Sequence, residues 1–114
     1  NTHESIETYR NEYENFERKD ILFIKNEYTG ILDNVEKIDS IIDKFSIGWS
    51  VDRLSTVDKA ILRIAVYEIM FDDDIPNKVS VNEAVELAKE FSEDKAPSFI
   101  NGVLGKVVRY KEAN

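Results

Sequence analysis

The densest run of hydrophobic positions in the chain lies between residues 60 and 71. Ten of these twelve positions are apolar or aromatic, and only Arg63 and Glu68 are charged. A helix that is apolar nearly all round has neighbours on most sides. Twelve residues are too many for a typical buried strand, and Ala, Leu and Met favour helix. Because Ser55 can cap free N–H groups and Asp58 follows three residues later, the pattern predicts a central helix over 55–71.

Upstream, apolar positions recur every three or four residues in two segments. Between residues 5 and 16 they predict an amphipathic helix, and from Asp20 to Phe45 they predict one uninterrupted helix of about 37 Å. Gly30 lies inside this second helix, where glycine costs about 1 kcal/mol relative to alanine, so we expect a neighbouring helix to approach closely there. A coiled-coil seam is the alternative, but a helix of this length in a short domain usually belongs to a bundle.

Residues 46–54 break the helical periodicity. Gly48 predicts a helix stop, and Trp49 is the single tryptophan of the chain. We interpret Trp49 as an anchor that braces two lobes, with a ligand platform as the alternative. After the central helix, three consecutive aspartates at 72–74 lack the Glu and Gly that a calcium loop needs, so they predict a solvated acidic connection.

Two more helices are predicted after this connection. Ser80 and Glu83 form a capping box that predicts the start of the first, whose inward positions are Val81, Ala84, Val85, Ala88 and Phe91. The second is predicted to begin at Pro97 or Ser98, since proline suits the first helical turn. Its inward positions are Ile100, Val103, Leu104 and Val107.

Two glycines stand three residues apart in the last predicted helix. Gly102 and Gly105 together cost about 2 kcal/mol relative to alanine, so we expect something to pack close to the backbone or touch it there. The five predicted helices indicate an all-α bundle of two small lobes in a single domain, divided at residues 1–48 and 49–114.

The inventory of reactive side chains argues against an enzyme. The chain has no Cys, a single His (His3) and no glycine-rich phosphate loop, so the usual materials for metal sites, nucleophilic triads and nucleotide cradles are missing. We therefore expect no catalytic residue, no metal and no cofactor. No run reaches the length of a membrane span and no signal peptide is evident. Together with the lack of Cys, this pattern favours a cytoplasmic protein.

The charge is unevenly distributed along the chain. The net charge of −8 argues against nucleic acid as a partner, because phosphate contacts need a cationic face. Residues 95–114, however, carry four basic residues and one acidic residue, which leaves −11 for residues 1–94. This asymmetry predicts two faces with different partners.

A dense series of sequence blocks runs from Trp49 to Leu104, about half of the chain. The blocks are Trp49-Ser50, Asp52-Arg53-Leu54-Ser55, Asp58, Ala60-Ile61-Leu62-Arg63, Ala65-Val66-Tyr67-Glu68, Ile75-Pro76, Lys78-Val79, Val81-Asn82-Glu83-Ala84-Val85-Glu86-Leu87-Ala88-Lys89 and Phe99-Ile100-Asn101-Gly102-Val103-Leu104. In these blocks the sequence resembles the NusB family of bacterial transcription antitermination factors. The blocks from Asn82 to Lys89 and from Phe99 to Leu104 are the most specific, while residues 1–48 match only in helical pattern.

The resemblance implies a non-catalytic helical protein of two lobes. It implies pairing with NusE, a ribosomal protein of the small subunit, and binding to boxA RNA of nascent ribosomal RNA transcripts in the RNA polymerase antitermination complex. The same fold also occurs as an RNA-binding appendage of ribosomal RNA cytosine methyltransferases. Since no methyltransferase domain follows here, the free-standing factor is favoured.

The chain departs from the family at its start. NusB-like proteins begin with an Arg-rich helix that contacts phosphates and fills part of the amino-terminal core, and this sequence begins after the position of that helix. We therefore expect weak RNA binding. We also expect a homodimer through the amino-terminal lobe, because the helices left there would expose apolar residues.

The resemblance also points to RNA-binding residues. In the family the connection before the last helix and its first turn lie on the RNA side, and the matching positions are Lys95, Ser98, Phe99 and Asn101. Lys95 can bind a phosphate, Ser98 lies at a helix start that attracts phosphate, and Phe99 can stack on a base or pack in the core. Asn101 can bind a base edge or fix the loop. Lys106 extends the cationic strip or simply complements the helix dipole.

A second functional class is a protein-interaction adaptor. A basic ribosomal protein would dock readily on the −11 surface of residues 1–94, with fast and salt-sensitive association. RNA contacts would then be minor.

Overall fold

The computed structural model describes residues 25–114. Residues 25–33 are helical, and the further elements are α2 (Val35–Phe45), the short 3₁₀ helix η1 (Val51–Arg53), α3 (Thr56–Phe71), α4 (Asn77–Phe91) and α5 (Ala96–Ala113). This part of the chain contains helices and no strand, which confirms the all-α prediction. The helix predicted over 5–16 and the predicted helix start at Asp20 lie outside the described residues.

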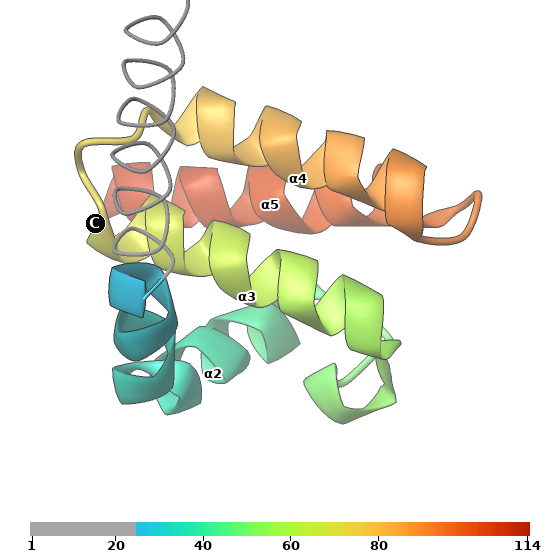
Figure 1. Ribbon diagram of the computed structural model, residues 1–114, viewed down its shortest axis with the longest axis horizontal. Helices are drawn as coiled ribbons and strands as arrows, with labels where there is room; N and C mark the ends of the chain where they lie inside the picture. The colour runs from blue at the N-terminus through green and yellow to red at the C-terminus, as the bar shows by residue number, and fades with distance from the viewer. Residues whose placement is uncertain (1–24) are drawn as a thin grey trace, which may run out of the picture.

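The helix α3 is the centre of the packing. Consecutive helices α3, α4 and α5 run antiparallel and pack on one another, and α2 crosses below α3 (Figure 1). Leu62, Val66 and Ile69 of α3 are fully buried, and each such side chain contributes about 1.5–3 kcal/mol of hydrophobic stabilisation. Ile64 and Phe71 are 37% and 40% exposed, so one side of α3 is covered less than its composition predicts.

The start and end of α3 follow the sequence pattern. The Ser55 hydroxyl accepts a hydrogen bond of 3.1 Å from the Asp58 N–H, which is the predicted cap. After Phe71 the Asp72 carboxylate accepts from the Asp74 N–H at 3.1 Å, a local turn that leads the chain away from the helix. The predicted acidic connection is therefore present between α3 and α4.

The long helix predicted from Asp20 to Phe45 is wrong, because the chain turns at Asn34. The Asn34 side chain donates a hydrogen bond of 2.8 Å to the Gly30 carbonyl, and its backbone N–H bonds instead to the Ile31 carbonyl at 3.2 Å. Asparagine side chains compete with the backbone in this way, so helices tend to break at them. The segment 25–33 and α2 consequently run in different directions (Figure 1).

The segment 25–33 packs against α3 at Gly30. A Cβ atom at residue 30 would lie 2.5 Å from Cζ of Tyr67, so only glycine lets the phenol ring approach, as the sequence predicted. Near this contact, burial raises the pKa of the Glu27 carboxyl to about 8, with further contributions from a hydrogen bond to Glu68 and from the charges of Glu68 and Asp72. Glu27 is therefore protonated at neutral pH.

The predicted capping box of α4 is wrong. The helix begins at Asn77, with Pro76 rather than Ser80 at the N-cap position, four residues earlier. The Pro76 carbonyl accepts from the N–H groups of Val79 and Ser80 at 2.9 and 3.3 Å and already forms the first turn. Ser80 lies within the helix, 2% exposed, and its hydroxyl has no hydrogen-bond partner among the described residues. Ala84 and Ala88 are buried as predicted, whereas Phe91 is 61% exposed and is not a core residue.

The helix α5 matches its predicted core face. It begins at Ala96, one residue early, and buries Ile100, Val103, Leu104 and Val107. The close packing predicted at its glycines is wrong for the part of the chain described here. A Cβ at Gly102 would meet nothing within 4 Å, and one at Gly105 would meet only Arg109 at 3.6 Å. Between residues 25 and 114, no helix combines the length and apolarity that a membrane span requires.

Candidate nucleic-acid interface

A cleft of about 500 Å³ opens where η1, the start of α3 and the start of α5 meet. Its size falls within the usual range of small-ligand pockets. The lining combines two aromatic rings, two cations and two carboxylates with small and apolar side chains: Trp49, Arg53, Leu54, Ser55, Asp58, Glu93, Lys95, Ala96 and Phe99. The lining suits a ligand that has a planar ring, hydrogen-bond donors and a negative charge: the aromatic rings can stack on the ring, the carboxylates can accept from the donors and the cations can bind the charge.

The backbone of Trp49 is fixed by hydrogen bonds, whereas its side chain is largely exposed to solvent. Gly48 adopts a φ of 85°, which turns the chain after α2. The Trp49 N–H donates to the Ser46 carbonyl at 3.0 Å, and the buried Ser46 hydroxyl lies 2.6 Å from the Trp49 carbonyl. The Trp49 side chain is nevertheless 54% exposed and lines the cleft, so the predicted anchor between two lobes is wrong.

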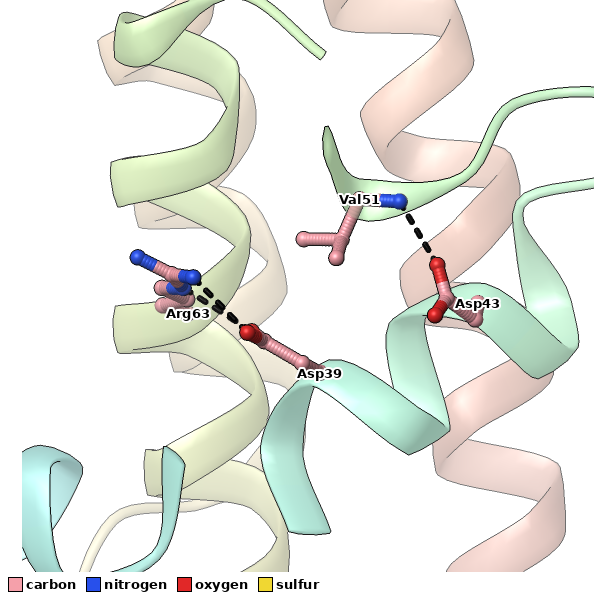
Figure 2. Close-up of polar contacts among 4 residues, drawn as sticks. All are labelled: Asp39, Asp43, Val51 and Arg63. Atoms are coloured by element: carbon pink, nitrogen blue, oxygen red, sulfur yellow. Dashed lines mark hydrogen bonds and ion pairs between the residues drawn. The ribbon is translucent and has the colours of Figure 1, made fainter. Parts of the chain in front are cut away.

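Two polar contacts of α2 hold this region in place (Figure 2). The Asp43 carboxylate accepts a hydrogen bond of 2.6 Å from the Val51 N–H, which fixes the start of η1. Asp39 accepts from Nε and Nη2 of Arg63 at 2.8 and 2.7 Å, which joins α2 to α3. This hydrogen bonding raises the pKa of the Arg63 guanidinium above its ordinary value. Val51 itself is buried, so η1 is anchored by its side chain as well as by its backbone.

The opposite wall is tied together by Asp58. Oδ1 of Asp58, at the start of α3, accepts a hydrogen bond of 2.6 Å from the hydroxyl of Ser92, just after α4. Its backbone N–H is bound by Ser55. The half-buried carboxylate is therefore fixed in orientation, and its second oxygen has no donor among the described residues.

The structure brings together only two of the five predicted RNA-binding residues. Lys95 is exposed at the start of α5, Phe99 is half-buried one turn later, and both line the cleft. Ser98 and Asn101 are exposed on α5 outside the cleft, and Lys106 is half-buried further along the helix. Phe99 also packs against the core, so its two predicted roles are compatible.

Lys106 and Arg109 lie on the same side of α5 as the cleft residues Lys95 and Phe99. At about 100° per residue, Lys95, Phe99, Lys106 and Arg109 fall within a sector of about 80° on α5, whereas Asn101 lies about 120° from Lys95. None of the three cations forms an ion pair with another described residue. A cationic strip can therefore lead along α5 from the cleft, and Asn101 is the predicted residue that fits it least.

Of the nine lining residues, Lys95 and Phe99 were predicted as RNA contacts and Trp49 was a ligand platform only as the alternative. The charged residues Arg53, Asp58 and Glu93 were not predicted as part of a site. Trp49, Arg53 and Asp58 are distant in sequence from Lys95 and Phe99 and meet them because α3 packs against α5. Glu93, by contrast, lies two residues before Lys95. The one available signal was a tryptophan directly after a glycine stop, which marks a ring at the edge of a turn. Over residues 25–114, no three His, Cys, Asp or Glu side chains lie where they could share a metal ion.

Comparisons with known proteins show which family and fold the chain shares. The sequence model of the NusB family matches residues 1–109. Transcription antitermination protein NusB from Clostridium novyi is 50% identical over 95 residues, or 83% of this chain and 71% of that protein. The NusB protein of Acetivibrio thermocellus is 54% identical over 89 residues, or 78% of this chain and 61% of that protein.

A solved structure shares the fold. The T. maritima NusB structure matches with a TM-score of 0.71 and 38% sequence identity, over 74% of this chain and 59% of that one. Across these three proteins, the matched region spans 59–71% of the relative's length.

Proposed function

Because the chain belongs to the NusB family, we propose that it is a non-catalytic transcription antitermination factor that binds boxA RNA of nascent transcripts together with NusE. The observation that carries this proposal is the match of the family model to residues 1–109, which includes every element around the cleft. The antitermination complex of RNA polymerase is then the assembly in which the chain acts.

The start of α5 supplies the contacts that single-stranded RNA needs. Lys95 is an exposed cation beside the half-buried ring of Phe99, so a phosphate and a splayed base can be bound side by side. No side chain from residues 25–114 caps the first turn of α5, and a helix start attracts phosphate oxygens. Ser98 lies in this turn. Lys106 then supports a second phosphate farther along the strip.

The proposal can be tested by fluorescence anisotropy with labelled boxA RNA. The RNA is titrated with the chain alone, with NusE alone and with both, at two salt concentrations. We expect RNA binding that weakens with salt and tightens when NusE is present. Lys95→Glu should weaken RNA binding by about tenfold and make the salt dependence shallower, because a phosphate contact is lost.

A matched control is Lys78→Glu. Lys78 is also an exposed lysine in the first turn of a helix, α4, but it does not line the cleft. This change has the same effect on net charge and should leave RNA affinity within about twofold. Equal losses for the two variants, or no RNA binding in any mixture, would contradict the proposal.

The adaptor function has an observation in its favour, the net charge of −11 on residues 1–94. It predicts that NusE binding survives Lys95→Glu unchanged and falls steeply with salt, while RNA contributes little to the complex. A detached RNA-binding domain of a ribosomal RNA methyltransferase, the remaining alternative, would bind structured ribosomal RNA without NusE.

A further inference from the structure

We propose that the cleft is a base-binding subsite selective for guanine, in which Trp49 and Phe99 stack on the base and Asp58 binds its Watson–Crick edge. This inference presupposes the RNA-binding function proposed above and names the base that the site takes. It adds Trp49 and Asp58 to the residues that the family resemblance indicates.

The two rings are suited to stacking on a ligand rather than on each other. Trp49 and Phe99 line the same cleft from different elements, the turn before η1 and the first turns of α5, and they do not form an aromatic pair among the described residues. Tryptophan is highly buried on average, yet Trp49 is 54% exposed on a backbone that is fixed by two hydrogen bonds. Exposed aromatic rings on rigid backbone are the platforms on which single-stranded nucleic acids stack.

The charges around the cleft separate phosphate from base. Arg53 and Lys95 are exposed cations of the lining and can bind the backbone phosphates on either side of a nucleotide. The carboxylates of Asp58 and Glu93 would repel those phosphates, so they are suited to hydrogen-bond donors such as the N–H groups of a base. Of the two, Asp58 is half-buried and fixed by Ser92, whereas Glu93 is exposed.

A carboxylate can distinguish the four bases, because it binds only bases that donate hydrogen bonds to it. An ionised carboxylate only accepts hydrogen bonds. Guanine alone offers two adjacent N–H groups on its Watson–Crick edge, at N1 and N2, whereas adenine and cytosine place an acceptor beside their amino group and uracil flanks its one N–H with two carbonyls. Oδ2 of Asp58, which has no donor among the described residues, would gain most from guanine.

Trp49 makes the test direct, because it is the only tryptophan of the chain and its fluorescence reports on the cleft alone. Four RNA hexamers of uridine that carry G, A, C or U at the third position are titrated into the full chain. Binding is followed by Trp49 fluorescence and by anisotropy of labelled RNA. We expect the G hexamer to quench Trp49 and to bind at least tenfold more tightly than the other three.

Two variants separate selectivity from stacking. Asp58→Asn keeps the shape of the side chain and an oxygen for Ser92, so it should reduce the preference for G to less than twofold while affinity for the U hexamer stays within twofold. Asp94→Asn, a change in an exposed aspartate of the connection between α4 and α5 that does not line the cleft, should leave the preference intact. Trp49→Ala should weaken binding of all four hexamers by about tenfold.

The possible outcomes show whether the guanine site alone is wrong or whether the proposed RNA-binding function is wrong as well. RNA binding seen by anisotropy without any change in Trp49 fluorescence, or with equal affinity for the four hexamers, would overturn the guanine site and leave the RNA-binding function standing. Quenching of Trp49 by an arginine-rich peptide but not by the hexamers would assign the cleft to a protein partner and overturn the proposal. If no RNA binds with or without NusE, the site and the proposed function both fail.

Discussion

The ion pair between Arg63 and Asp39 helps to hold α2 against α3, and the effect of removing it on the unfolding free energy can be worked out. The two side chains form a bidentate contact of 2.8 and 2.7 Å, with 31% and 24% of their surfaces exposed. Planar bidentate pairs of this kind are the strongest ion pairs in proteins. Asp39→Asn and Arg63→Met each break the pair while keeping most of the volume.

The expected magnitude follows from the partial burial of the pair. A hydrogen bond to a charged group is worth about 1.5–3 kcal/mol, and solvent screening at about a quarter exposure reduces this to about 1–2 kcal/mol for the pair. Each single variant should therefore lose about 1–2 kcal/mol of unfolding free energy. For a chain of this size that loss lowers Tm by about 5–10 °C. The double variant should be only slightly less stable than the less stable of the two single variants, because the same ion pair is lost in all three.

Urea unfolding of the wild type, the two single variants and the double variant measures the coupling energy of the pair. The matched control is the pair of Lys89 and Glu86, which is 3.1 Å long but has 58% and 68% of its side chains exposed, and which should couple by less than about 0.5 kcal/mol. A coupling energy for Arg63 and Asp39 no larger than that of the control pair would refute this account of α2.

Three further predictions concern residues 25–33. The pKa of Glu27 is about 8 in the folded chain and 4.5 when unfolded, so its stabilising contribution is present below pH 4.5 and is lost as the pH rises towards 8. In urea unfolding, Glu27→Gln should therefore raise the unfolding free energy more at pH 9 than at pH 5.5. The control Glu90→Gln should show no such difference between the two pH values. Gly30→Ala should lower the unfolding free energy by about 1–3 kcal/mol, because the added methyl group overlaps Tyr67. In a chain that already carries Tyr67→Ala, the same change should leave the unfolding free energy unchanged or raise it. A higher unfolding free energy for Gly30→Ala alone, measured in urea, would contradict the contact. Leu32 is 53% exposed on this segment, so the chain should dimerise at high concentration in sedimentation equilibrium and Leu32→Lys should weaken the dimer; a monomer at every concentration would contradict it.

The sequence predicted best the elements whose signals are local. The apolar run over 60–71 and the hydroxyl of Ser55 led to α3 within one residue, and Pro97 led to the start of α5. Gly30 was correctly predicted to allow a close approach, because its cost within a helix needs a reason in the packing. Local propensity and periodicity suffice where they agree with each other.

The errors arose where two signals competed. Ser80 and Glu83 satisfy a capping box, but Pro76 supplies a carbonyl that starts α4 one turn earlier. The period of three and four continues across Asn34, yet its side chain displaces the backbone hydrogen bond to Gly30. Periodicity records which face is apolar and does not record whether the backbone continues as a helix.

The cleft could not have been predicted from the sequence as a whole. Lys95 and Phe99 came from resemblance to a family, and the structure places them together. Their neighbours Trp49 and Asp58 are 37 to 50 residues away in the chain and reach the cleft through the packing of α3 on α5, which no local pattern encodes. Tertiary packing therefore decides the composition of the site.

Amide chemical-shift mapping by NMR, with ¹⁵N-labelled chain and boxA RNA in the presence of NusE, tests most directly whether RNA binds at the start of α5. Shifts that depend on the RNA, compared with NusE alone, should be largest at residues 93–99 and 49–58, the segments that line the cleft. Shifts that leave both segments unchanged while α4 responds to the RNA would contradict the assignment of the cleft as the RNA interface.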